Sequence, residues 1–87
     1  MKLTERTMHF DAALGAVLRE ARIERKMSQE SVARALGITF QQIQKYEKGG
    51  NRIATGTLVL LAYALAENPI SLFTRALARH DAAMDLL

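Results

Sequence analysis

The stretch that decides the fold is SQESVARALGITFQQIQKYEKG, residues 28–49. Ser28 and Thr39 stand where helix N-caps belong, each just before a segment with helical apolar spacing. Gly37, between the two segments, is typical of a left-handed helix stop. The stretch therefore predicts two short helices joined by a tight glycine turn. They are expected to span residues 29–36 and about 40–48.

Small and apolar residues within this stretch are spaced as two steeply crossing helices require. Ala33 is the small residue at the expected contact, and Ile38 is the aliphatic residue directly after the turn. On a helical wheel, Ile43 and Tyr46 fall together on the inward side of the second helix. The layout is that of a helix-turn-helix. Its predicted core residues are Val32, Ala33, Leu36, Gly37, Ile38, Ile43 and Tyr46.

On the opposite side of the second helix, the sequence predicts a strip of amides and amines that contains no acid. The strip holds Gln41, Gln44, Lys45 and Lys48 within about 100° of arc. Glutamine can bond N6 and N7 of adenine, and lysine can donate to O6 and N7 of guanine in the major groove of DNA. An ordinary solvent-facing helix is the alternative interpretation, and the strip alone leaves both open.

The rest of the chain also shows helical patterns. Asn68 and Pro69 form an N-cap followed by a proline at the first helical position, and no stretch alternates as a strand would. Apolar spacing predicts further helices at about Asp11 to Lys26 and Thr57 to Ala66. We therefore expect an all-α, five-helix domain. This single domain is expected to cover residues 1–87. Within it we expect an N-terminal extension at 1–10, the helix-turn-helix at 29–48 and a C-terminal helix at 69–87.

Composition narrows the class of protein. The chain has 87 residues and no cysteine, which suits one domain without disulfides or cysteine-ligated metals. It shows no secretory signal and no apolar run long enough for a membrane span, so we expect a cytoplasmic location. Residues 19–52 carry eight Lys/Arg and four Glu, whereas the remainder carries four basic and five acidic residues. Positive charge is thus concentrated around the helix-turn-helix, as a polyanion-binding surface requires.

The segment at 28–49 resembles the helix-turn-helix of the phage repressor and Cro family, the XRE-like bacterial transcriptional regulators. The Ser-Gln-Glu opening, the Ala-x-x-x-Gly turn and the Tyr-Glu-x-Gly close all match. The resemblance extends more loosely from Leu14 to Phe73. Relatives often carry a proline in the loop after the second helix, whereas this chain has GGNRIATGT at 49–57, which we expect to be mobile.

The resemblance implies double-stranded DNA as the partner, a palindromic operator, a homodimer, a repressor and no cofactor. It implies contacts to base edges from Phe40, Gln41, Gln44 and Lys45. It implies contacts to phosphates from Ser28, Gln29, Lys48, Asn51 and Arg52. It also implies an internal ion pair between Arg22 and Glu47, which the position of Arg22 beside the apolar stripe of its helix supports.

Alternatives remain at this stage. The protein could be an antitoxin or another module that docks a partner protein, or a controller of a restriction–modification operon. His9 and His80 lie far apart in sequence without a metal or catalytic motif, so we expect no metal and no enzyme, and a packed or interface role for His80. The expected dimer contacts in the C-terminal helix are Leu77, Met84 and Leu87.

Overall fold

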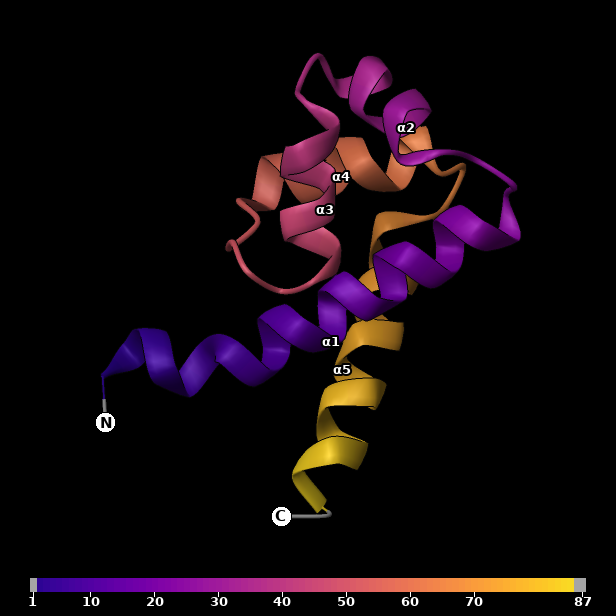
Figure 1. The fold of residues 1–87 in the computed structure, drawn as a ribbon. Helices are drawn as coiled ribbons and strands as arrows, with labels where there is room; N and C mark the ends of the chain where they lie inside the picture. The colour runs from indigo at the N-terminus through magenta and orange to yellow at the C-terminus, as the bar shows by residue number, and fades with distance from the viewer. Residues whose placement is uncertain (1, 86–87) are drawn as a thin grey trace.

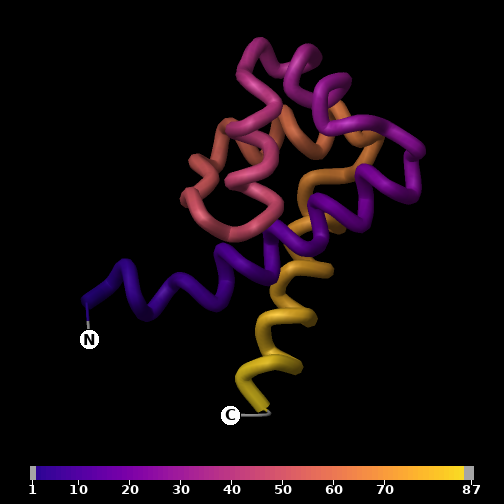
Figure 2. The backbone as a smooth tube through the Cα atoms, viewed as in Figure 1, coloured from indigo at the N-terminus to yellow at the C-terminus, as the bar shows by residue number. Residues whose placement is uncertain are grey.

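The computed structural model describes residues 2–85, and this part of the chain contains five α-helices and no strand (Figure 1). The predicted all-α, five-helix architecture is confirmed. The helices are α1 (Leu3–Glu24), α2 (Gln29–Leu36), α3 (Phe40–Glu47), α4 (Thr55–Ala64) and α5 (Pro69–Asp85). In Figure 2, α2, α3 and α4 cluster on one side of α1, whereas the start of α1 and the end of α5 extend away from that cluster.

One apolar core joins all five helices. Leu14, Val17, Leu18 and Ala21 recur at three- and four-residue intervals on α1 and form its buried stripe. The other helices meet this stripe with residues from their inward faces. These are Val32 and Ala33 of α2, Ile43 of α3, Leu61 and Ala62 of α4, Leu72 and Ala76 of α5, and Leu65 between α4 and α5.

The turn between α2 and α3 is built as the sequence predicts. The hydroxyl of Ser28 accepts a hydrogen bond from the Ser31 backbone N–H at 3.0 Å, which caps α2. Gly37 ends α2 with φ at +72°, a left-handed conformation that favours glycine. Thr39 then caps α3 by accepting from the Gln42 backbone N–H at 3.2 Å. Local signals alone therefore fix both ends of this turn.

Six of the seven predicted core residues of the motif lie in the core or pack against it, whereas Gly37 is exposed because it forms the turn. Val32, Ala33 and Ile43 are buried between the helices. The remaining apolar side chains of the motif are half-buried and pack against that core; these are Leu36, Ile38 and Tyr46. Ala33 thus occupies the small-residue position that lets two short helices approach each other.

Two helix boundaries differ from the predicted ones. Helix α1 begins at Leu3 rather than near Asp11, so residues 3–10 are part of α1 and not a separate extension. Leu3 and Met8 are exposed there, so the apolar stripe that marks a core-facing helix is missing from these turns. Helix α4 spans Thr55–Ala64 rather than Thr57 to Ala66. Its start was predicted too late because its N-cap, Ala54, has no side chain that could make a capping hydrogen bond and mark the start in the sequence.

Helix α5 is held against α1 by aromatic and ionic contacts. The Phe10 ring of α1 lies 5.4 Å from the Phe73 ring and 5.8 Å from the His80 ring, so His80 is a packed side chain as expected. Between Phe73 and His80 on α5, Arg75 pairs with Glu20 of α1 at 3.7 Å. The two helices therefore cross over a mixed apolar and charged contact.

Two helices end on residues other than glycine in a left-handed conformation. Lys26 follows α1 with φ at +55°, and Ala66 follows α4 with φ at +54°. Each lies in a turn closed by a backbone hydrogen bond, such as the one from Glu67 N–H to the Ala62 carbonyl at 2.8 Å. An L-residue in this conformation costs about 1 kcal/mol relative to glycine.

No single helix in the described part of the chain is long and apolar enough to cross a membrane. Helices α4 and α5 meet such a criterion only when they are taken together, and they are bent by 108° at their junction. Several of their leucines, including Leu61 and Leu72, belong to the buried core.

Candidate nucleic-acid interface

The outer face of α3 is polar, cationic and accessible. Gln41 and Lys45 are exposed, Gln44 is half-buried, and Phe40 stands at the exposed start of the helix. Ile43, on the opposite side, is buried in the core. Within residues 2–85, Lys45 takes part in no ion pair, so its ammonium is available to an external anion.

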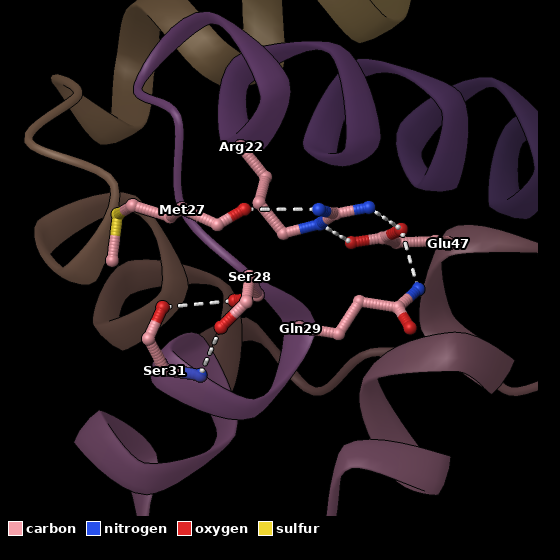
Figure 3. A network of polar contacts seen from close by, with 6 residues as sticks. All are labelled: Arg22, Met27, Ser28, Gln29, Ser31 and Glu47. Atoms are coloured by element: carbon pink, nitrogen blue, oxygen red, sulfur yellow. Dashed lines mark hydrogen bonds and ion pairs between the residues drawn. The ribbon is translucent and has the colours of Figure 1, made fainter.

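Glu47 is the only acid on α3, and it is turned away from this outer face (Figure 3). Its carboxylate accepts from Arg22 Nε at 2.7 Å and from Arg22 Nη2 at 3.0 Å, so the pair is bidentate. The Glu47 side chain is 5% exposed and the Arg22 side chain 14% exposed. The structure thus brings the predicted ion pair together and neutralises the one acid of α3.

The ion pair belongs to a larger polar network that joins three helices. Arg22 Nη1 donates to the Met27 carbonyl at 3.0 Å, in the link between α1 and α2. Gln29 Nε2 donates to Glu47 Oε1 at 3.0 Å, which joins the start of α2 to the end of α3 (Figure 3). The hydrogen bond to Glu47 raises the pKa of the Arg22 guanidinium, against burial, which lowers it. The network holds α3 at a fixed angle to α1 and α2.

The residues expected to contact phosphate lie at the start of α2, at the end of α3 and in the loop that follows α3. The contact between Gln29 and Glu47 places the start of α2 beside the end of α3. Ser28 is exposed at that start while its hydroxyl caps α2. Lys48 and Asn51 are exposed. One N–H of the Gln29 amide is used within the protein, which leaves its other N–H for an outside acceptor.

Arg52, the fifth of these residues, is tethered. Its Nη2 donates to the hydroxyl of Thr7 and lies 3.7 Å from the Asp11 carboxylate, both on α1. The loop that the glycine content suggested would be mobile is thus attached to the body of the protein. Sequence analysis missed Thr7 and Asp11, because it placed them before or at the start of the first helix.

Glycines let α1 approach α3 closely. A Cβ added at Gly15 would lie 2.3 Å from the Tyr46 carbonyl oxygen and 2.7 Å from that of Glu47. Gly49 has φ at +73°, and a Cβ there would lie 2.7 Å from the Cα of Ala12. Only a glycine permits such distances. A glycine in the apolar stripe of the first helix is the sequence signal that could have identified Gly15.

The geometry defines a helix-turn-helix protein, and comparison with known proteins agrees. The sequence model of the helix-turn-helix family matches residues 18–70. A transcriptional regulator in the ATPase CF(0) region of Rhodospirillum rubrum is 46% identical over 77 residues, which cover 88% of this chain and 70% of that protein. The chain belongs to the helix-turn-helix family of DNA-binding transcriptional regulators, and the family predicted from its sequence is confirmed.

Other relatives are longer than the matched region. An HTH-type transcriptional regulator of Sinorhizobium fredii is 44% identical over 63 residues, which cover 72% of this chain and 44% of that protein. A regulator of Rhizobium meliloti is 46% identical over 64 residues, which cover 74% of this chain and 45% of that protein. The chain therefore spans less than half the length of these two relatives.

Solved structures show the same fold. The clp gene regulator ClgR from Corynebacterium glutamicum superposes with a TM-score of 0.81 over 88% of this chain and 85% of that one, at 22% identity. The restriction-modification controller protein C.AhdI from Aeromonas hydrophila superposes with a TM-score of 0.68 at 29% identity, over 71% of this chain and 94% of that one.

Proposed function

We propose that this regulator recognises one specific double-stranded DNA sequence by inserting α3 into the major groove, and that it represses transcription by occupying a promoter. The observation that carries the proposal is the outer face of α3, which displays accessible amide and ammonium groups while its one acid is buried against Arg22. Gln41, Gln44 and Lys45 would bond base edges, and Phe40 would pack on a thymine methyl. The proposal places the protein in the cytoplasm with its DNA and assigns it no catalytic step.

Phosphate contacts beside the end of α3 would fix the register of this helix on the duplex. Ser28 and Gln29 would contact one stretch of backbone from the start of α2, and Lys48, Asn51 and Arg52 would contact another from the end of α3 and its loop. Such contacts set position, whereas contacts to base edges set sequence preference. Their support is that Gln29 lies beside the end of α3, where Lys48 follows, and that Ser28, Lys48, Asn51 and Arg52 are exposed.

The decisive experiment is selection of bound duplexes from a random pool, which reports sequence preference, symmetry and half-site spacing together. We expect one enriched motif. About six phosphate contacts should make affinity fall roughly 10³-fold between 50 and 200 mM salt. A pool without enrichment, or an affinity insensitive to salt, would contradict the proposal.

Two substitutions separate contacts to bases from contacts to phosphates. Lys45→Ala should change which base is preferred at one or two positions, at a cost of about 1–3 kcal/mol on the selected sequence. Arg52→Ala should weaken binding to all duplexes about equally and lower the salt slope by about one. If both variants bind every sequence equally weakly, the division between the two groups of residues is wrong.

The same proposal includes a homodimer formed through α4 and α5. Apolar residues lie all around α4, a composition typical of a buried helix, yet its Tyr63 is 64% exposed. On α5, Ile70 is 77% exposed, and Leu77 is exposed further along the helix. An apolar groove of about 330 Å³ runs between the two helices. It is lined by Thr55, Leu58, Val59, Pro69, Ile70 and Phe73.

A second copy of the chain is the occupant we propose for this groove, because a twofold dimer presents two α3 helices to a palindromic operator. Of the predicted dimer contacts, Leu77 is exposed and Met84 is half-buried, whereas Leu87 lies outside the described residues. Ile70→Glu should therefore yield a monomer by light scattering. Ile23→Glu, at an exposed isoleucine on α1, is the matched control and should leave the dimer intact. A wild-type monomer, with and without DNA, would contradict the dimer.

One comparison favours a second, narrower role. The controller protein C.AhdI is 29% identical and matches over nearly its whole length, so control of a restriction–modification operon is the second candidate. The selected operator separates the two roles. A controller of this kind requires the motif upstream of its own gene beside restriction and modification genes, and a motif found only at unrelated promoters would exclude it.

A further inference from the structure

Arg52 is held by α1 along one edge of its guanidinium. Its Nη2 donates to the Thr7 hydroxyl and faces the Asp11 carboxylate at 3.7 Å. Thr7 and Asp11 lie four residues apart, so both project from the same face of α1 toward the loop after α3. The contact joins two segments that are 45 residues apart in sequence, counted from Thr7 to Arg52.

In the described part of the chain, the other nitrogens of the Arg52 guanidinium make no hydrogen bond, and the side chain is accessible. The side chain is 51% exposed, whereas the Asp11 side chain is 15% exposed, so the carboxylate lies behind the arginine rather than beside it on the surface. Guanidinium has five N–H donors in a planar fork, and within residues 2–85 only Nη2 of Arg52 is engaged. The Nε–H and the two Nη1–H groups are therefore available to a second acceptor, on a guanidinium whose position is already fixed at Nη2.

The loop that carries Arg52 is fixed by the same helix. Gly49, three residues before Arg52, packs against the backbone of Ala12, which directly follows Asp11 on α1. Backbone and side chain of this loop are thus both supported by the turns of α1 between Thr7 and Ala12. An ordered side chain loses less conformational entropy when it binds a ligand than a free one does.

We propose that Thr7 and Asp11 are positioning residues for DNA binding: they hold Arg52 so that its remaining N–H donors bond a backbone phosphate beside α3. This inference rests on the proposed function. It gives the first turns of α1 a role in affinity, although they lie outside the helix-turn-helix itself.

Charge and position predict opposite effects for Asp11. A carboxylate near DNA repels phosphate, so on charge alone Asp11→Asn should strengthen binding to every duplex. If Asp11 acts by orienting Arg52, the same substitution should weaken binding. The sign of the change therefore separates the two explanations, and Glu5→Gln supplies the effect of charge alone. Glu5 is an exposed acid on the same turns and makes no contact with Arg52.

The experiment is a double-mutant cycle on the selected duplex, measured by fluorescence anisotropy at several salt concentrations. We expect Asp11→Asn and Thr7→Val each to weaken binding about three- to tenfold, with Glu5→Gln binding as tightly as wild type or more tightly. In an Arg52→Ala background, Thr7→Val should have no effect and Asp11→Asn should no longer weaken binding but show only the effect of charge that Glu5→Gln shows, because the group that both residues position is absent. Circular dichroism melting of each variant reports whether the fold is intact.

Three outcomes would overturn the inference: Asp11→Asn binds as tightly as wild type, Asp11→Asn and Thr7→Val weaken binding equally with and without Arg52, or Arg52→Ala leaves affinity unchanged. Thr7→Val removes only a hydroxyl on the surface and keeps the test available if Asp11→Asn melts early. Failure of the proposed function looks different, because wild type would then show no salt-dependent binding to any selected duplex and Lys45→Ala would change no preference.

Discussion

Two arginine–carboxylate contacts connect α1 with α3 and with the loop that follows α3, and they differ in burial. Arg22 and Glu47 form two hydrogen bonds, at 2.7 and 3.0 Å, with side chains 14% and 5% exposed. Arg52 and Asp11 face each other at 3.7 Å, with side chains 51% and 15% exposed. The first contact is bidentate and largely removed from water, whereas the second is open to solvent on the arginine side.

The difference shows how the same chemistry serves two purposes. Removing one partner from a buried pair leaves a charge without solvent or counterion, which is strongly destabilising. An exposed pair contributes little to folding, because water and salt compete for both groups. The buried contact therefore maintains the fold beneath α3, and the exposed contact is free to exchange a partner or to share its arginine with a ligand.

The largest effect is expected at the buried contact. Glu47→Ala should lower the free energy of unfolding by about 3 kcal/mol or more, because Arg22 and the Gln29 amide lose their acceptor in a water-poor site. Urea denaturation followed by circular dichroism measures the change. Replacing both partners, as in Arg22→Met with Glu47→Leu, should recover part of the loss. An unchanged melting temperature for Glu47→Ala would show that the buried pair of Arg22 and Glu47 does not maintain the fold.

A smaller effect is expected where α1 touches the end of α3 between the two contacts. Gly15→Ala places a Cβ against the Tyr46 carbonyl and should cost about 1–3 kcal/mol of stability. Gly56→Ala in α4 is the matched control, since nothing lies within 4 Å of the added Cβ and alanine favours helix by up to about 1 kcal/mol. Thermal melts should therefore shift in opposite directions. Equal shifts would mean that the approach at Gly15 is not tight.

The exposed contact should matter little for folding. Asp11→Ala is expected to change the free energy of unfolding by no more than about 1 kcal/mol, and by less as salt rises, because Arg52 is half exposed. Urea denaturation at low and high salt measures it beside Glu47→Ala. A loss at Asp11 as large as the loss at Glu47 would show that burial does not distinguish the two contacts.

The smallest effect concerns alkaline pH. Because the pKa of Arg22 is raised in the folded protein, the stability that Arg22 provides is fully present below the pKa of an unfolded arginine and is lost only above it. The difference in stability between wild type and Glu47→Ala should therefore stay constant from about pH 7 to pH 10. A difference that shrinks across this range would mean that another group controls the network.

Sequence patterns predicted most of the motif because its signals are local. Ser28 and Thr39 cap their helices, Gly37 takes a left-handed φ, and Ile43 faces the core while Lys45 faces outward. Each of these features depends on residues only a few positions apart. Periodicity and capping chemistry are sufficient for such features, and the family resemblance added the pairing of Arg22 with Glu47.

The contacts that the sequence did not predict are those between distant segments. Nothing near Arg52 indicates that it reaches Thr7 and Asp11, and nothing near Gly15 indicates which backbone approaches it. The first turns of α1 also project from the body, so they carry no apolar stripe, and the start of the helix was placed too late. Exposed helix and long-range polar contact leave no periodic trace in a single sequence.

The left-handed residues at the ends of α1 and α4 have a practical consequence. Lys26 and Ala66 both occupy a conformation that glycine adopts without steric strain, and neither belongs to the set of residues proposed to touch DNA. The natural sequence therefore has a lower melting temperature than the same fold could reach. Glycine at these two helix ends is thus the first substitution to try for a more stable variant in crystallography or biosensing, and we expect it to leave the preferred DNA sequence unchanged.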